Sequence, residues 1–367
     1  MIFERVELVD FRNYREAVFA PTPGTTLVVG DNGHGKTNLV EAMAYLGTLT
    51  SFRGAPPDAL VRVGASEAVL RAEVRDDDGR RSLIEAALAP AGRNRVQVNR
   101  QRLPRARDLL GVVRVTVFSP DDLTLVKGGP GDRRRYLDDT LVALAPKYDT
   151  SRRELDRIVR QRNVLLRQTG GHLDDDAART LDVWDAKLVE TGEHFGYARA
   201  TLVARIAPFV IDAYEQLAPT PIAIGLSYDP LWRRTGLAAA LAEARRDDLR
   251  RGVSTVGPHR DELGLTIGGL PARTHASQGE QRTLALALRL GAHRLVAERT
   301  GSVPVLVLDD VLSELDPGRA AALLSHLPDG QIVITTAGGV PAAAVPERVL
   351  RVVDGNVADG AAAERTT

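Results

Sequence analysis

A glycine-rich segment near the N-terminus has the residue types and spacing of a phosphate-binding loop. It fits the pattern G-x-x-x-x-G-K-[ST], in which glycines let backbone N–H groups surround phosphate oxygens and the following helix adds its dipole. In such a loop Lys36 reaches the β and γ phosphates and the hydroxyl of Thr37 binds Mg²⁺. We expect His34 to face solvent. The segment therefore predicts a nucleotide site at Gly30, Asp31, Asn32, Gly33, His34, Gly35, Lys36 and Thr37.

Two adjacent aspartates follow an apolar run that is far away in the sequence. The run Val303 to Leu308 leads directly into Asp309 and Asp310. A buried strand that ends in a carboxylate suits a Mg²⁺ ligand opposite Thr37, and the next carboxylate can polarise an attacking water. Many strands end in Asp at a turn, so the two aspartates alone are weak evidence for a metal site. Together with the phosphate loop they become strong evidence. We predict Asp309 as a metal ligand, and Asp310 with Lys36 as catalytic residues.

A third polar segment precedes an Ala/Leu-rich helix. Ser277, Gln278 and Gly279 stand before residues 283–290, and Ser277 lies 32 residues before Asp309. Serine and glycine at the start of a helix form an anion site. The alternative is an ordinary capping box between Ser277 and Glu280, three residues later. Both interpretations can hold at once.

The elements that must position these segments alternate between strands and helices. A β-rich run at 25–29 precedes the phosphate loop, and Leu39, Met43 and Leu46 mark one face of the helix after it. Residues 67–99 alternate like strands, and 222–226, 303–308 and 332–335 are further predicted strands. Residues 133–251 show helical spacing, broken at 168–171. We predict an α/β head split in sequence, with these parts: 1–130 N-terminal head, 131–250 helical insertion, 251–355 C-terminal head and 356–367 disordered tail.

Composition limits the function classes. The 367 residues are 44% hydrophobic and 26% charged, which is typical of a globular protein. Cysteine is absent, which excludes disulfides, thiol catalysis and Cys-ligated metals. No apolar run approaches the length of a membrane span, and no signal peptide is visible, so we expect a cytosolic protein.

Global charge gives no reason to expect a polyanion ligand, but local charge does. Lys+Arg and Asp+Glu both total 48, whereas residues 131–170 carry a net charge of +4 and residues 245–260 one of +3. Arginine suits phosphate contacts. Acidic residues interrupt the row, so a solvated, salt-bridged helix is an equal alternative. The predicted DNA contacts are Arg133, Arg134, Arg152, Arg153, Arg157 and Arg160.

The order of these motifs resembles that of ABC-type ATPase heads. The phosphate loop, the serine–glycine signature and the aspartate-ended strand come first, and Ser313-Glu314-Leu315-Asp316 follows as a turn. Finer motifs, spread over residues 1–316, resemble the RecF family of DNA repair proteins, which is related to structural-maintenance-of-chromosomes heads. These motifs are Phe11-Arg12-Asn13-Tyr14, Phe118-Ser119-Pro120, Asp122-Leu123, Leu125-Val126-Lys127-Gly128, Arg133-Arg134-Arg135-Tyr136-Leu137-Asp138, Gln161-Arg162-Asn163 and Gly257-Pro258-His259-Arg260-Asp261.

The resemblance implies a P-loop ABC-type head that binds ATP and Mg²⁺, with Arg12 at the nucleotide. It implies that Ser277, Gln278 and Gly279 of one copy contact the γ-phosphate of another, so that ATP closes a homodimer. The expected activity is a weak, DNA-stimulated ATPase that acts as a switch. The implied partners are double-stranded and gapped DNA, RecR and RecO, at the nucleoid and not at a membrane.

One departure concerns the last predicted strand. General ABC ATPases place a histidine after it, whereas this chain has Thr335 and Thr336 there. RecF-like proteins resemble this chain in that respect, and we therefore expect slow hydrolysis.

Three other classes fit less well. The ATPase subunit of a membrane transporter shares the loop and the signature. In this chain, however, Ser277 lies 241 residues after Lys36, which leaves room for a helical insertion that such subunits normally lack. An overcoming-lysogenization-defect protein joins its head to a nuclease, for which too few residues follow Asp316. A repair ATPase with a zinc hook needs cysteines and sustained heptads.

Overall fold

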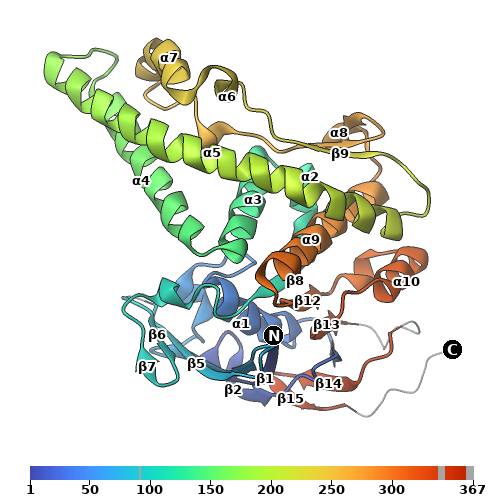
Figure 1. Cartoon of the computed structure of the whole chain (residues 1–367). Helices are drawn as coiled ribbons and strands as arrows, with labels where there is room; N and C mark the ends of the chain where they lie inside the picture. The colour runs from blue at the N-terminus through green and yellow to red at the C-terminus, as the bar shows by residue number, and fades with distance from the viewer. Residues whose placement is uncertain (91, 338–343, 361–367) are drawn as a thin grey trace. The chain divides into compact units, whose positions relative to one another are not determined.

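The computed structural model describes residues 1–90, 92–337 and 344–360, and its contacts divide the chain into two compact units (Figure 1). Unit 1 comprises residues 1–123, 212–221 and 282–367, and unit 2 comprises 124–211 and 222–281. These limits differ from the predicted ones mainly at 251–281, which we predicted as head but which belong to unit 2. The reason is strand pairing, because a strand at 264–267 hydrogen-bonds to one at 224–227.

One sheet of unit 1 is antiparallel throughout. Its strand order is β2-β1-β4-β5-β6-β7. The first two strands are joined by the tight turn at Arg12 and Asn13, with Phe11 paired to Tyr14. Its strands confirm the alternation seen in the sequence before residue 20 and over 67–99. They are β1 (Ile2–Phe11), β2 (Tyr14–Phe19), β4 (Ala68–Arg75), β5 (Arg81–Leu88), β6 (Arg95–Val98) and β7 (Gln101–Arg102).

The second sheet of unit 1 is parallel except at one edge, in the order β15-β14-β3-β13-β12-β8. Its inner strands β12 and β13 are fully buried and mainly aliphatic, with polar residues only at their carboxyl ends, as expected for a sheet covered on both faces. The prediction of disorder from residue 356 is wrong for the first residues of the tail, because Val357 pairs with Val352 in an antiparallel strand. Residues 361–367 lie outside the described residues. The strands are β3 (Thr25–Val29), β8 (Val115–Phe118), β12 (Val305–Asp309), β13 (Ile332–Thr336), β14 (Arg348–Val353) and β15 (Asn356–Asp359).

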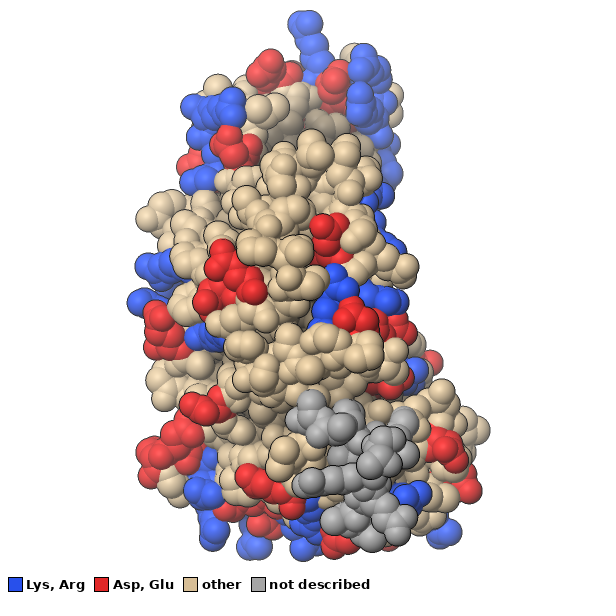
Figure 2. Space-filling view, turned by 90° about the vertical axis from the view of Figure 1, so that its right-hand side faces the viewer, with Lys and Arg blue, Asp and Glu red and all other residues tan. Residues whose placement is uncertain are grey.

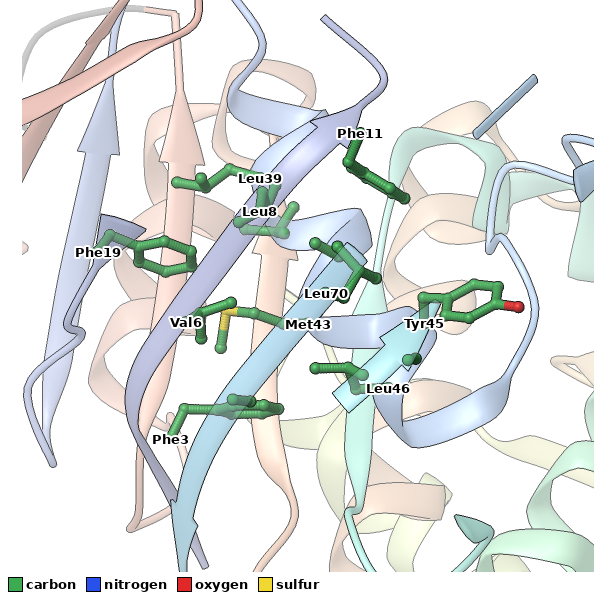
Figure 3. Close-up of a cluster of buried hydrophobic side chains, with 14 of the residues drawn as sticks. Phe3, Val6, Leu8, Phe11, Phe19, Leu39, Met43, Tyr45, Leu46 and Leu70 are labelled. Carbon is green, nitrogen blue, oxygen red and sulfur yellow. The ribbon is translucent and has the colours of Figure 1, made fainter. Parts of the chain in front are cut away.

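Helix α1 (Lys36–Thr48) packs its apolar residues into a core shared by both sheets. In Figure 3, Leu39, Met43 and Leu46 of this helix lie among Phe3, Leu8 and other side chains of the antiparallel sheet. Each of these five side chains is fully buried. The same cluster includes valines of the parallel sheet. Helix α1 therefore packs against residues of both sheets.

Unit 2 is mainly helical and carries a three-stranded antiparallel sheet, β11-β10-β9. Two long helices, α5 and α9, have residues in both units. None of the helices in the described ranges is both long and apolar enough to cross a membrane. The remaining elements are α2 (Thr124–Lys127), α3 (Pro130–Leu144), α4 (Lys147–Gln168), α5 (Asp175–Leu217), β9 (Ile224–Ser227), α6 (Trp232–Thr235), α7 (Leu237–Arg251), β10 (Gly264–Ile267), β11 (Leu270–Pro271), α8 (Ala272–His275), α9 (Gln278–Thr300) and α10 (Pro317–Ser325).

A buried arginine joins three helices of unit 2. Arg162 on α4 has no exposed surface, and it pairs with Asp185 of α5 and with Asp248 of α7, each at 2.6 Å. It also donates to the hydroxyl of Ser254 at 2.9 Å, and Asn163 accepts from the same serine. The Gln161-Arg162-Asn163 motif is thus an internal connection of this unit.

Candidate nucleotide site

The predicted phosphate loop lies where the parallel sheet meets α1. It connects the end of β3 to the first residue of α1, Lys36, and β12 and β13 end at the same edge because they run parallel to β3. Ligands bind at the carboxyl ends of parallel strands in folds of this kind. The sheet therefore brings Lys36, Thr37 and Asp309 to one edge from segments that are far apart in sequence.

Lysine and glycine shape the inside of the loop. Lys36 is 7% exposed and its ammonium group donates to the carbonyl of Asp31 at 2.9 Å, so it folds back over the loop. Gly35 has φ +111°, and an added Cβ would stand 2.6 Å from the side chain of Asn13. Only glycine fits this position, because both the backbone conformation and the space exclude a side chain.

The outside of the loop is held by the turn between β1 and β2. The side-chain amide of Asn13 donates to the carbonyl of His34 at 3.1 Å, and the Tyr14 hydroxyl donates to the carbonyl of Gly35 at 2.9 Å. Burial raises the pKa of Tyr14, so its hydroxyl stays protonated and remains a donor. Carbonyls fixed outward leave the N–H groups to face inward, which is the requirement for binding phosphate. The Phe11-Arg12-Asn13-Tyr14 motif thus shapes the loop.

Asp309 is the carboxylate that the fold places opposite Thr37. Its Oδ1 accepts from the Thr37 hydroxyl at 3.0 Å and from the Thr335 hydroxyl at 2.7 Å. Burial raises the pKa of Asp309, and the neighbouring charge of Asp310 adds to that rise, against the effect of the two hydroxyl donors. A carboxylate disfavoured in this way gains from a bound cation.

Asp310 has an unusual backbone and an unsatisfied side chain. Its φ is +51°, and its N–H is bonded to the hydroxyl of Thr335 at 2.9 Å. Its Oδ1 is buried and has no hydrogen-bond partner among the described residues. A strained residue with an orphaned acceptor is typical of a functional position. The sequence did not predict that the Thr335 hydroxyl would hydrogen-bond to both aspartates.

These residues fit Mg²⁺ and a nucleotide triphosphate. Mg²⁺ prefers a few oxygen ligands and keeps its remaining positions for water and phosphate, which suits one hydroxyl, Thr37, and one carboxylate, Asp309. In the described part of the chain no cluster of three or more His, Asp or Glu forms a cage for a metal. The phosphate loop and the buried Oδ1 of Asp310 lie at this same edge.

Arg12 is placed differently from the expected nucleotide contact. Its guanidinium forms two bonds of 2.8 Å with Glu41, which is fully buried on α1, and a third of 2.9 Å with the carbonyl of Ala59. Arg12 therefore ties the turn before the loop to α1. An arginine that sequence reasoning missed lies closer to the chemistry, because Arg53 donates to Asn38 at 3.1 Å and its charge acts on Asp309.

The predicted signature begins α9 and forms the capping box. The Ser277 N–H donates to Glu280 at 2.7 Å, and the Glu280 N–H donates back to the Ser277 hydroxyl at 3.3 Å. Ser277 and Gln278 are exposed, and Gly279 is partly exposed. The helix cap accounts for one side of the serine, and its exposure leaves it open to another molecule.

The turn after Asp310 is tied to the helix that follows the signature. Arg282 forms an ion pair with Glu314 and donates to its carbonyl at 2.9 Å, and Asp316 caps α10 by accepting from Arg319 at 3.0 Å. Ser313 donates to the carbonyl of Asp310 at 2.8 Å. The aspartate-ended strand and the Ser313–Asp316 turn are thus one connected segment.

The predicted DNA contacts separate into buried and exposed arginines. Arg133 is 6% exposed, since Glu262 accepts two of its bonds and backbone carbonyls accept others, so it cannot reach a phosphate. Arg134 donates to the carbonyl of Asp261 at 2.8 Å and is partly buried. Both stabilise unit 2 from within. This removes Arg133 from the predicted interface.

The other four arginines lie on α4. Arg152 pairs with Asp139 and Asp149, which leaves it partly buried. Arg153, Arg157 and Arg160 are exposed. Of these, Arg153 pairs with Asp149 at 3.1 Å and Arg157 pairs with Glu154 on the same helix. On the separate face drawn in Figure 2, which lies away from α4, basic and acidic side chains are interspersed and do not form one large patch of a single sign. An interface on α4 rests on a few arginines.

Comparison with known proteins finds relatives over nearly the whole chain. A sequence model described as "RecF/RecN/SMC N terminal domain" matches residues 2–355. A protein of Streptomyces avermitilis named "DNA replication and repair protein RecF" is 45% identical over 90% of this chain and 92% of its own length. One of the same name from Kineococcus radiotolerans is 42% identical over 97% of this chain and 98% of its own.

Solved structures agree in fold. The structure described as "the recombination mediator protein RecF-ATPrS in RecFOR pathway" is 28% identical and matches with a TM-score of 0.90 over 98% of both chains. An Smc head bound to the C-winged helix domain of ScpA matches in fold alone, at 17% identity and a TM-score of 0.60 over 97% of this chain and 96% of that one. The phosphate loop, the aspartate-ended strand and these matches show that the chain belongs to the RecF family of ABC-type ATPases.

Proposed function

We propose that this chain is an ATP-dependent DNA-binding protein of recombinational repair and replication restart at gapped DNA. ATP binding closes a dimer on DNA, slow hydrolysis reopens it, and the protein helps to load a recombinase together with RecR and RecO at the nucleoid in the cytoplasm. The observation that carries the proposal is the meeting of Thr37, Asp309 and Thr335 beside a braced phosphate loop. The names of the relatives support the repair role.

The residues of the loop have distinct parts in the switch. Lys36 and the inward N–H groups bind the β and γ phosphates, and Thr37 with Asp309 holds Mg²⁺, which would supply charge neutralisation there. The buried Oδ1 of Asp310 orients the attacking water and accepts its proton. Arg53 adds positive charge at the mouth of the site.

Slow hydrolysis follows from the residue that replaces the histidine. The Thr335 hydroxyl donates to Asp309 and accepts from the N–H of Asp310, so its only proton and one of its two lone pairs hold the aspartates. A hydroxyl used in this way has no free proton to give to the reacting water. Turnover then depends on Asp310 alone, which suits a switch that stays closed for long periods.

Dimer closure rests on the signature. Ser277 uses its hydroxyl oxygen to accept from its own helix, so the hydroxyl hydrogen can be donated to a phosphate oxygen of another copy. Gln278 is exposed beside it, and the first turn of α9 contributes N–H groups and the positive end of the helix dipole. The cap and the contact in trans are therefore compatible.

DNA binding is assigned to the exposed arginines of α4: Arg153, Arg157 and Arg160. They provide phosphate contacts without base readout, so affinity should fall steeply with salt and depend little on sequence. The modest charge of one copy makes closure by ATP important, since two copies on one duplex bind with the combined effect of both patches.

The test is fluorescence anisotropy on gapped and blunt duplexes, with and without ATP and Mg²⁺, together with sedimentation. We expect tighter binding with ATP and a dimer under the same conditions, both abolished in Lys36→Ala. Replacing Arg153, Arg157 and Arg160 by glutamine should weaken DNA binding and lower the salt slope by about 1 for each phosphate contact that is removed. DNA affinity that does not respond to ATP would contradict the switch.

A further inference from the structure

The phosphate loop is held by a second segment, which comes from the far end of the chain. The turn between β14 and β15 consists of Asp354 and Gly355. The Gly355 N–H donates to the carbonyl of His34 at 3.2 Å, and the Asp354 N–H donates to Nδ1 of the His34 ring at 3.3 Å. The other ring nitrogen, Nε2, lies 3.9 Å from the Asp354 carboxylate. His34 therefore contacts this turn with its backbone and with both ring nitrogens.

Strand pairing places the turn beside the loop. β14 runs parallel to β3, with Leu350 opposite Val28 and Arg351 opposite Val29, so both strands end at the same edge of the sheet. The segment after β3 is the phosphate loop, and the segment after β14 is the turn. The register fixes the two side by side.

The fit between the loop and the hairpin is close. A Cβ added to Gly30, the first residue of the loop, would lie 2.3 Å from the carbonyl oxygen of Val352. Gly355 has φ +75°, and a Cβ there would lie 3.2 Å from the carbonyl oxygen of Asn13. The hairpin thus approaches the loop so closely at Gly30 that no side chain fits there, and at Gly355 it packs tightly against the β1–β2 turn.

His34 is less open to solvent than predicted, because its side chain is 25% exposed and its ring accepts the Asp354 N–H. Since Nδ1 accepts the Asp354 N–H, it carries no proton, and the ring hydrogen is on Nε2, facing the Asp354 carboxylate. Its position inside the phosphate loop gives this contact a consequence for the nucleotide.

We propose that His34 is a positioning residue that latches the phosphate loop to the β14–β15 hairpin, so that nucleotide binding and the order of the hairpin are coupled. The inference rests on the proposed function of this loop and names a regulator of it. A bound triphosphate needs the N–H groups of the loop to face inward, and the latch holds the carbonyl of His34 outward. By reciprocity, a nucleotide that favours this arrangement must also stabilise the turn.

The experiment compares His34→Ala with His34→Asn, whose side-chain oxygen can accept the Asp354 N–H. Val353→Thr is the matched control, because Val353 lies on the same hairpin but is 45% exposed. Two quantities are measured on the whole protein: the dissociation rate of a fluorescent ATP analogue, and hydrogen exchange of the Asp354 and Gly355 amides with and without the analogue.

In the parent protein we expect the analogue to slow exchange at both amides. His34→Ala should release the analogue about 3–10-fold faster, as expected when one hydrogen bond of ordinary net strength is removed, and should abolish the slowing at the Asp354 amide, whose N–H loses its acceptor. The Gly355 N–H bonds to the backbone carbonyl of His34, which the variant keeps, so the slowing at Gly355 should only weaken. His34→Asn should restore part of both effects, and Val353→Thr should change neither.

Two outcomes overturn the latch: exchange at the turn that does not respond to the analogue in the parent, or a parent-like release rate in His34→Ala. A merely structural role would lower the melting temperature of His34→Ala but leave the protection by nucleotide intact. The failure of the proposed function would look different, since the parent itself would then not bind the analogue.

Discussion

Charged side chains in the nucleotide site and in the helices of unit 2 differ in whether the fold itself neutralises them. At the carboxyl edge of the parallel sheet, the Lys36 ammonium group donates to a backbone carbonyl, and Oδ1 of Asp310 has no partner within the described ranges. In unit 2, Arg162 and Arg199 are buried against aspartates. The site thus leaves a carboxylate oxygen without a donor, whereas the arginines of unit 2 are ion-paired inside the fold, although Nη2 of Arg162 also has no hydrogen-bond partner within the described ranges.

Buried charges at a ligand-binding site differ from buried charges that only stabilise the fold. Burial of a charge costs free energy unless it is paired, so a buried arginine between carboxylates indicates internal structure. A buried carboxylate oxygen without a partner indicates a missing group. The same residue types, aspartate and a basic side chain, thus have opposite meanings in the two units.

The largest expected effect is that of Lys36→Ala on nucleotide binding. The β and γ phosphates lose the only lysine of the loop, and we expect binding to weaken by at least about a thousandfold, close to abolition. Lys36→Arg should retain part of the binding and turn over poorly, because a planar fork does not replace a compact ammonium group. Titration with a fluorescent ATP analogue measures both, and parent-like affinity in Lys36→Ala would contradict the site.

Arg162→Met should affect stability and leave nucleotide affinity unchanged. Two carboxylates, one of them fully buried, would lose their partner, at an expected cost of about 3–5 kcal/mol in the free energy of unfolding. The control is Arg157→Met on the same helix, whose pair with Glu154 is exposed and should contribute little to stability. Urea denaturation separates the two. Equal effects would mean that burial does not distinguish these arginines.

A buried histidine gives unit 1 a pH dependence that involves no ligand. His293 on α9 is 1% exposed and bonds to Thr116, and burial lowers its pKa to about 4. Between pH 6.5 and about 4 the unfolded chain binds the proton more readily, so stability falls as pH falls through that window, by on the order of 3 kcal/mol. His293→Gln should flatten this dependence. An unchanged slope in the variant would assign the acid sensitivity elsewhere.

Thr335→Val should slow ATP hydrolysis, because it removes hydrogen bonds to Asp309 and Asp310, and it should leave the strand itself intact because valine is close to threonine in size. The variant removes a donor to one aspartate and an acceptor for the backbone of the next. We expect hydrolysis to fall about 10–100-fold and the Mg²⁺ requirement to rise, whereas Thr335→Ser should retain most of the activity. Phosphate release at varied Mg²⁺ tests this. Parent rates in Thr335→Val would show that the threonine only fills space.

The sequence predicted those parts of the fold that follow from local periodicity. Hydrophobic periodicity predicted the strand at 25–29, the helix face of Leu39 and Met43, and the aspartate-ended strand. Burial imposes such a periodicity on the local sequence. The order of the strands in the sheets could not be predicted from the sequence. It depends on which distant segments pair, and so do the positions of Thr335 and the β14–β15 hairpin.

The site residues could be predicted where the spacing of residue types in the sequence is itself specific for a chemical role. The phosphate loop has such a spacing, and Asp309 follows from it. The pairing of Arg12 and Arg133 with carboxylates inside the fold could not be predicted, because an arginine in a motif has the same letter whether it faces a ligand or a buried carboxylate. Glu41 and Glu262, which decide the matter, lie 29 and 129 residues away from them.

The most direct test of the account is sedimentation of Ser277→Arg and Asp310→Asn with ATP and Mg²⁺. We expect Asp310→Asn to bind ATP and remain a closed dimer, because hydrolysis no longer reopens it. Ser277→Arg should bind ATP as a monomer, since a bulky cation replaces the small donor that faces another copy's γ-phosphate. If Ser277→Arg instead forms a dimer of parent affinity and only melts lower, by the ~0.5–2 kcal/mol of a missing helix cap, the signature does not act between copies.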